Sequence, residues 1–179
     1  MVASILPKFY RINVKNINIF NQHIYLDEFL FLTTNVRRIH FYHTVVKNED
    51  GTIVPFEKLI KLLPRVENIE VSNKSEFLCI TTETVKELLE LPHFSKIIEF
   101  DLSDICELFD IKTFFAYMKK NPSTKFSLYF NPVSEAFKIR LEEIIADIIE
   151  SKTRGIDLNF IGLDRQKHLK IRKLYHRSR

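Results

Sequence analysis

The middle of the chain contains a short apolar stretch, Lys96-Ile97-Ile98-Glu99-Phe100-Asp101-Leu102, from which the fold can be predicted. It has the composition of a short buried β-strand, and similar stretches recur at 36–42, 66–71, 125–130 and 155–160. Each contains two large apolar residues that flank one other residue: Ile39/Phe41, Ile69/Val71, Ile98/Phe100, Leu128/Phe130 and Leu158/Phe160. The first members of these pairs lie 30, 29, 30 and 30 residues apart, and a fixed period in this range is typical of a repeat architecture.

Apolar residues between these stretches recur with the period of an α-helix. The pattern predicts five helices, which begin near Tyr25, Pro55, Thr81 or Thr84, Ile111 and Ser134. In the first helix, we expect Leu26, Phe29 and Leu30 to face inward. In the third helix, we expect Thr84 and Glu87 to form a capping box, and we expect Ser134 to be the N-cap of the fifth helix. Before them, segments 9–14 and 17–20 alternate as strands do, and one of them is a candidate for a degenerate first repeat.

A single helix–strand pair cannot bury its own apolar face, so we expect about five such units of ~30 residues to stack around one core. Helical crossovers imply a parallel sheet on one side and helices on the other. The predicted class is α/β. The predicted organisation is one repeat (solenoid) domain over 1–163, followed by a basic C-terminal helix or tail over 164–179, with a helix from about Asp164 to Tyr175.

Composition narrows the class of protein further. A chain of 179 residues with 45% hydrophobic residues suits one domain with a substantial core. Its two cysteines make neither a disulfide framework nor a zinc cluster, which favours free thiols in a reducing compartment. No secretory signal and no apolar run of ~20 residues is present, so we expect an intracellular protein, cytoplasmic or nuclear, with no membrane span. We expect a monomer without a cofactor.

The net charge of +4 is unevenly distributed. Seven Lys/Arg and no Asp/Glu lie between residues 165 and 179, so the rest of the chain has a balance of −3. A solvated chain end is the favoured interpretation of this basic tail, and a nuclear-import signal is a further one. The functional alternative is phosphate contact with a nucleic acid, through Lys167, Lys170, Arg172, Lys173 and Arg177.

Side chains alternate along a strand, so the residues between the apolar pairs should face outward and form rows on the open face of the sheet. We expect the middle row to be His40, Glu70, Glu99, Tyr129 and Asn159. Aromatic and polar groups of this kind are common in protein interfaces. The predicted partner-binding residues are therefore His40, Tyr42, Glu70, Glu99, Asp101, Tyr129 and Asn159.

The motifs of common catalytic and metal sites are missing from the sequence. The three glycines are isolated, so no phosphate-binding loop is present, and His40 and His43 should point to opposite faces of a strand. Cys106 stands among acidic residues, which disfavour a thiolate, and Cys79 has no activating basic neighbour. We therefore expect no enzymatic activity and no bound metal.

Several stretches resemble the leucine-rich-repeat-like region downstream of the F-box in nematode F-box proteins. They are 25–32, 47–55 (KNEDGTIVP), 84–89 (TVKELL), 109–121 (FDIKTFFAYMKKN) and 138–142, and the resemblance extends over about residues 20–175. It implies a leucine-rich-repeat-like solenoid that recruits a protein for ubiquitination within a ubiquitin ligase complex. No F-box-like helical segment is recognisable in residues 1–24.

Overall fold

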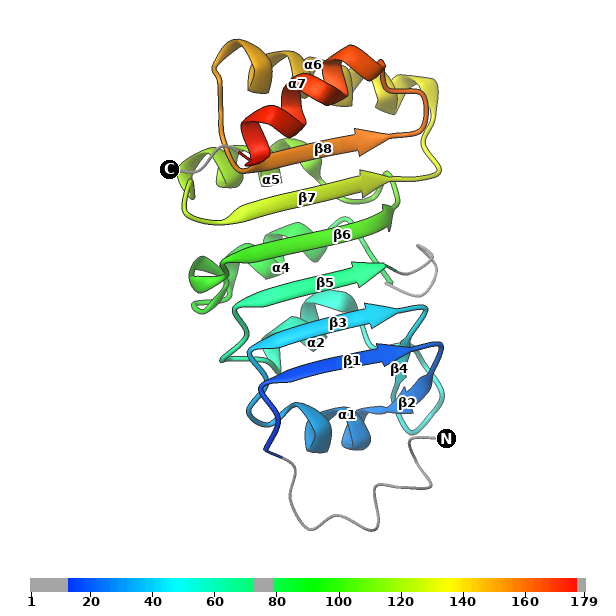
Figure 1. Cartoon of the computed structure of the whole chain (residues 1–179). Helices are drawn as coiled ribbons and strands as arrows, with labels where there is room; N and C mark the ends of the chain where they lie inside the picture. The colour runs from blue at the N-terminus through cyan, green and yellow to red at the C-terminus, as the bar shows by residue number, and fades with distance from the viewer. Residues whose placement is uncertain (1–12, 73–78, 177–179) are drawn as a thin grey trace.

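The computed structural model describes residues 13–72 and 79–176, and its central element is a six-stranded sheet (Figure 1). All neighbouring strands are parallel, and their spatial order β1-β3-β5-β6-β7-β8 follows the order of the chain. The strands are β1 (Asn16–Phe20), β3 (Arg38–Tyr42), β5 (Asn68–Ser72), β6 (Glu99–Ile105), β7 (Lys125–Phe130) and β8 (Ile156–Phe160). The predicted α/β class and parallel sheet are confirmed. Segment 17–20 is strand β1, whereas residues 9–12 lie outside the described residues.

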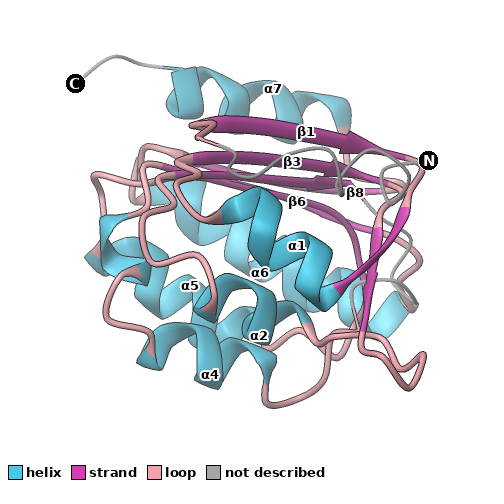
Figure 2. Cartoon of the chain, turned by 90° about the horizontal axis from the view of Figure 1, so that it is seen from below, coloured by secondary structure: helices cyan, strands magenta, loops and turns pink. Residues whose placement is uncertain are grey.

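Helices connect successive strands and cover one face of the sheet (Figure 2). They are α1 (Leu26–Thr33), α2 (Phe56–Lys61), α4 (Thr84–Glu90), the 3-10 helix η2 (Phe94–Lys96), α5 (Ile111–Lys120) and α6 (Glu135–Glu150). A second, two-stranded parallel sheet of β2 (His23–Tyr25) and β4 (Val45–Lys47) was not predicted. Such short strands carry too little alternation to be recognised in a sequence.

The core lies between the sheet and this helical layer. Phe100, Leu128 and Leu158 are at most 1% exposed, which confirms that these three repeated apolar residues are buried. Phe100 is at the centre of an aromatic cluster: its ring lies 5.3–6.3 Å from the rings of Phe56, Phe94, Phe114 and Phe126. Aromatic rings at these separations add to the stability that burial alone provides.

The predicted register is wrong by two residues in β6 and, in the opposite direction, by two residues in β7 and β8, where Phe126/Leu128 and Ile156/Leu158 align with Phe100/Leu102. Phe100 pairs with Ile69 and Leu102 with Val71, so the buried pair of β6 is Phe100/Leu102, and Ile98 is 51% exposed before the strand. Two residues are one full period of a strand, so the inward and outward faces are unchanged. The outward rows shift, however: Asp101, and not Glu99, stands beside Glu70.

The predicted basic C-terminal helix exists as α7 (Arg165–His176), but it lies on the face of the sheet opposite to the other helices (Figure 2). This corrects the expectation that all helices lie on one side. Ile171 and Leu174 are buried, because they form the apolar side of an amphipathic helix that packs against β8 and α6. The segment 165–176 is therefore part of the folded structure.

Local capping was predicted with mixed success. Ser134 is the N-cap of α6 and accepts a hydrogen bond from the Phe137 amide at 3.3 Å, as expected. The capping box at Thr84 is wrong: its hydroxyl is buried, accepts from the Thr81 amide and donates to Glu57 at 2.9 Å. Leu30 is also exposed, because Phe29 occupies the inward position of the short helix α1.

Candidate functional site

A groove of about 580 Å³ lies on the open face of the sheet, across the outward side chains of β1, β3, β5 and β6. We call it the open-face groove and define it by Asn16, Asn18, Arg38, His40, Asn68, Glu70, Glu99, Asp101 and Tyr175. The strands supply all of these residues except Tyr175, which comes from α7. Because α7 lies over the β8 end of the sheet, the groove occupies the part of the open face that this helix leaves uncovered (Figure 1).

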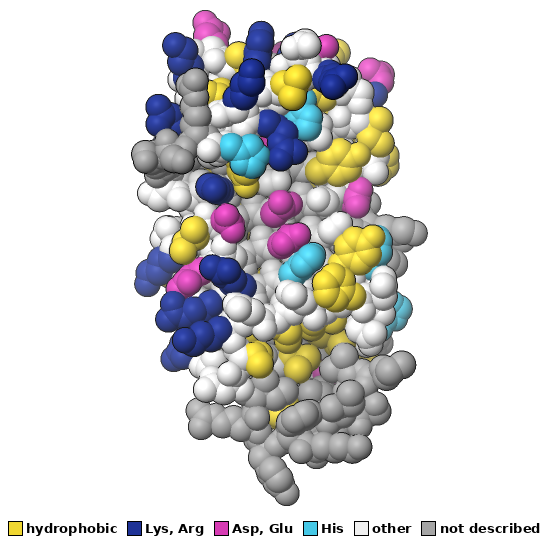
Figure 3. Space-filling view, in the orientation of Figure 1, with side chains coloured by type: hydrophobic (Ala, Val, Ile, Leu, Met, Phe, Trp, Pro, Cys, Tyr) yellow, Lys and Arg dark blue, Asp and Glu magenta, His cyan; other side chains and the backbone are white. Residues whose placement is uncertain are grey.

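Acidic side chains gather at the centre of the open-face groove, where Figure 3 shows a group of Asp and Glu residues. The register places Asp101 directly beside Glu70, and Glu70 lies 3.4 Å from His40. Burial raises the pKa of Asp101, Glu70 raises it further, and a hydrogen bond from Ser127 acts in the opposite direction. Glu70, Glu99 and Asp101 outnumber the one guanidinium of the lining, Arg38, so the formal charge of the groove is negative.

The carboxylate of Glu99 has a different environment from the pair Glu70 and Asp101. It lies one row nearer to the amino-terminal ends of the strands, where it accepts a hydrogen bond of 2.7 Å from the Asn68 side chain. An oriented carboxylate of this kind is positioned for charge-assisted hydrogen bonds with a cationic ligand. It extends the negative surface of the groove in the direction of Arg38, which lies in the same row.

An aromatic cluster borders the acidic centre of the groove. Phe20 contacts His40 in an edge-to-face geometry with ring centroids 5.2 Å apart, and its ring lies 6.2 Å from that of Tyr42. Phe20 is 47% exposed and Tyr42 39% exposed. Sequence reasoning identified Tyr42 but missed Phe20. The alternation of segment 17–20, with Ile19 inward, was the signal that could have found it.

Tyr175 closes the other side of the groove. Partial burial, followed by the nearby carboxylates of Asp101, Glu99 and Asp157, raises the pKa of Tyr175 to about 12. The ammonium group of Lys125 lies 5.7 Å from the centroid of its ring, within the range of a cation–π contact. The phenol of Tyr175 therefore remains neutral at physiological pH and is available as a hydrogen-bonding group.

The structure brings four of the predicted partner-binding residues together in the groove, namely His40, Glu70, Glu99 and Asp101. Tyr42 lies beside them on β3. Tyr129 and Asn159 do not join this set. They pair with each other on β7 and β8, and the Asn159 side chain accepts a hydrogen bond from the Phe160 amide at 2.8 Å. The prediction of a single row was wrong: it joined His40 and Glu70 to Glu99, Tyr129 and Asn159. In the structure, the row through His40 and Glu70 continues to Asp101, Ser127 and Asp157.

The four predicted nucleic-acid contacts that lie in α7 fall into two groups. Lys167 forms an ion pair with Glu142 of α6 at 2.9 Å, and Arg172 lies 4.0 Å from Asp157 of β8. Lys170 and Lys173 are exposed and have no acidic partner among the described residues. Arg177 lies outside the described residues. Two of the residues predicted to contact a nucleic acid, Lys167 and Arg172, are therefore directed toward carboxylates of the fold itself.

The described ranges 13–72 and 79–176 contain no group of three or more His, Cys, Asp and Glu side chains that could hold a metal ion. Cys79 and Cys106 are half-buried free thiols. None of the helices in these ranges combines the length and the apolar character that a membrane crossing requires.

Comparisons of this chain with protein-family models, with curated proteins and with solved structures found no match.

Proposed function

We propose that this chain is a non-enzymatic protein-interaction module that binds its partner in the open-face groove. The observation that carries the proposal is the juxtaposition of exposed aromatic rings, Phe20 and Tyr42, with the carboxylates of Glu70 and Asp101. Aromatic residues dominate the binding energy of protein interfaces, and a complementary charge increases the association rate and the specificity. The matching partner is a protein segment with basic residues next to an apolar or aromatic side chain.

A leucine-rich-repeat-like solenoid is the architecture that we propose for this module. The sequential order of the six parallel strands supports it, as does the recurrence of one inward apolar pair in each repeated strand. In a stack of this kind, each unit adds one strand to a continuous open face. A partner segment can then contact side chains from several units at once.

The resemblance to nematode F-box proteins supports a more specific role, which is the recruitment of a protein for ubiquitination within a ubiquitin ligase complex. An intracellular location, cytoplasmic or nuclear, belongs to this proposal. It rests on the sequence stretches that carry the resemblance, including residues 25–32 and 109–121.

Affinity capture with the intact chain tests both levels of the proposal. The captured proteins are identified and quantified, and the recruitment role requires cullin and adaptor subunits among them. The groove variant combines Tyr42→Ala with Glu70→Gln. Its matched control combines Ile139→Ala with Glu143→Gln on α6, which removes an exposed apolar group and an exposed charge far from the groove.

We expect the groove variant to reduce capture of the direct partner at least about tenfold, since two central contacts of an interface contribute more than 1 kcal/mol each. The control should capture as much as the unmodified chain. Equal capture by both variants would contradict binding in the groove. Capture of the partner without cullin or adaptor subunits would support the protein-interaction module and contradict the role in a ubiquitin ligase complex.

A further inference from the structure

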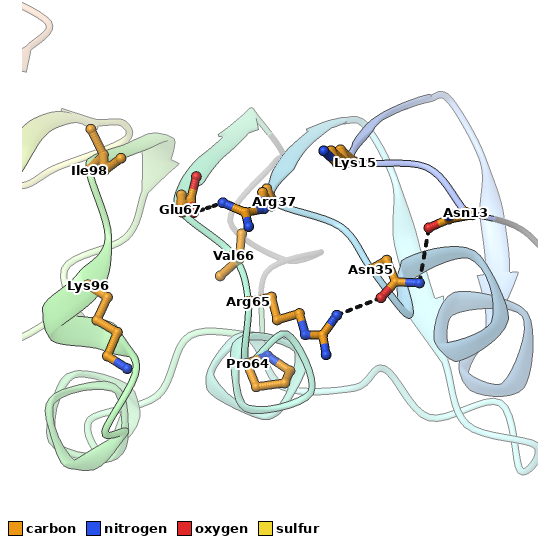
Figure 4. Close-up of a pocket in the computed structure, with 10 residues that line it drawn as sticks. All are labelled: Asn13, Lys15, Asn35, Arg37, Pro64, Arg65, Val66, Glu67, Lys96 and Ile98. Carbon is orange, nitrogen blue, oxygen red and sulfur yellow. Dashed lines mark hydrogen bonds and ion pairs between the residues drawn. The ribbon is translucent and has the colours of Figure 1, made fainter.

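A second cavity, of about 490 Å³, lies at the edge of the sheet where the strands begin. We call it the basic edge pocket. Its walls come from four successive units of the chain: the segments before β1, β3 and β5, and the link from η2 to β6 (Figure 4). The lining residues are Asn13, Lys15, Asn35, Arg37, Pro64, Arg65, Val66, Glu67, Lys96 and Ile98. None of them belongs to the open-face groove.

The lining of the basic edge pocket is strongly cationic. It holds four cations, Lys15, Arg37, Arg65 and Lys96, and a single carboxylate, Glu67, so that its formal charge is +3. Figure 3 shows Lys and Arg side chains gathered along this edge of the sheet. The chain without its last fifteen residues is acidic overall, with 20 basic and 23 acidic residues, so its average composition does not account for this concentration of positive charge.

Two of the cations are held in place by neighbouring side chains. Glu67 forms an ion pair of 2.5 Å with the Arg37 guanidinium. The Arg65 guanidinium donates to the Asn35 side chain at 2.8 Å, and the Asn35 amide donates to Asn13 at 3.2 Å (Figure 4). Each guanidinium has five N–H donors, so one contact leaves the others available. Held side chains lose less conformational entropy when a ligand binds.

The other two cations have no such partner. Lys15 and Lys96 are exposed and form no ion pair within the ranges that the structure describes. Four cations from successive units, together with an exposed apolar side chain at Ile98, require a ligand with several negative charges and some apolar surface. Neighbouring strands are about 4.8 Å apart, so a ligand that reaches from Lys15 to Lys96 spans about 14 Å.

We propose that the basic edge pocket binds an acidic protein segment with closely spaced Asp and Glu residues around an apolar side chain. Carboxylates match the planar donor fork of Arg37 and Arg65, the Asn13 and Asn35 amides can pair with the backbone of the segment, and Ile98 contacts its apolar residue. A nucleic acid is the weaker fit, because the lining contains no aromatic ring on which a base could stack. The protein thus has two separate binding surfaces of opposite charge.

The experiment measures fluorescence anisotropy of short labelled probes with the intact chain. The acidic probe is a peptide with Glu-Asp-Leu-Asp-Glu at its centre, the neutral probe has Gln-Asn-Leu-Asn-Gln, and an oligonucleotide of the same net charge as the acidic probe forms the third arm.

The pocket variant combines Arg65→Ala with Lys96→Ala. The matched control, Lys112→Ala with Lys120→Ala, removes two exposed cations of α5. Lys96→Ala alone removes an exposed side chain that forms no ion pair among the described residues, so it guards against misfolding of the double variant.

We expect the acidic peptide to bind in a salt-dependent manner, because screening weakens contacts between exposed charges. The pocket variant should weaken this binding at least tenfold and Lys96→Ala alone by a smaller factor. The control variant and the groove variant Tyr42→Ala with Glu70→Gln should leave it unchanged. Equal binding of the neutral peptide, equal losses in pocket and control variants, or tighter binding of the oligonucleotide through the same residues would overturn the proposal. Because the basic edge pocket shares no lining residue with the open-face groove, neither support nor contradiction of this proposal depends on what binds in the groove.

Discussion

Substitution of Ile171 tests whether α7 packs against the sheet or is a free basic tail. Ile171 has no exposed surface and lies on the apolar side of α7, whose partners are β8 and α6. Removing a buried Ile side chain to Ala costs about 2–5 kcal/mol, from the lost burial and the cavity that is left. A loss of ~3 kcal/mol would lower the melting temperature of a chain of this size by about 6–12 °C.

The assay is equilibrium unfolding in urea, with Leu169→Ala as the matched control. Leu169 is in the same helix but is 43% exposed, so its truncation should change the free energy of unfolding by at most about 0.5 kcal/mol. Both variants keep every charge of the helix. Any difference between them therefore reports the packing of α7 on the sheet.

Equal unfolding free energies for the two variants would refute the reasoning. In that case α7 would contribute no packing, and its cations would be free to contact another molecule, as the nucleic-acid alternative requires. If that alternative holds, oligonucleotide binding should be lost on Lys170→Ala with Lys173→Ala and should fall steeply with salt. We expect no such binding.

Three further predictions concern the core and the groove. Phe100→Ala should reduce the free energy of unfolding by about 3–5 kcal/mol in urea titrations, because Phe100 is buried among four other rings; a loss below ~1 kcal/mol would contradict the core assignment. Asp101→Asn should stabilise the protein at neutral pH. Burial raises the pKa of Asp101 in the folded state above 3.8, so the folded protein holds the carboxyl proton more tightly than the unfolded chain does. The folded protein therefore loses stability as the pH rises through the raised pKa. The difference between variant and unmodified chain should disappear below pH 3.8, and a constant difference at all pH values would show that the charge is not the cause. Titration of tyrosinate absorbance should show a component near pH 12 that Tyr175→Phe removes, and its persistence in that variant would place the shifted pKa elsewhere.

The acidic centre of the groove was predicted only in part, for a reason that lies in strand register. Glu70 and Asp101 were both expected on the open face, but Glu99 was placed beside Glu70 because Ile98 and Phe100 look like an apolar pair. Ile98, Phe100 and Leu102 share one alternation, so the sequence does not show which two of them are buried. The choice depends on the length of the connection through α4 and η2 and on how Phe94 packs against Phe100.

No continuous motif in the linear sequence marks the basic edge pocket. Lys15, Arg37, Arg65 and Lys96 are widely separated along the chain and form no charge run. They share only their place shortly before a strand, so a comparison of equivalent positions in each unit could have revealed them. Their concentration into one cavity results from the parallel stacking of the units, which brings the segments before neighbouring strands about 4.8 Å apart.

The local features of this protein follow from residues that are neighbours in the sequence. Alternation set which face of each strand is apolar, helical periodicity set the stripes of α5 and α6, and Ser134 set where α6 begins. Each of these depends on residues only a few positions apart, whose steric and hydrogen-bonding preferences act before the chain is folded. Tertiary structure alone decided the register of β6, the position of α7 on the open face and the convergence of charges in both cavities. Those features depend on packing between distant segments, because burial of an apolar face stabilises the protein only when another segment covers it.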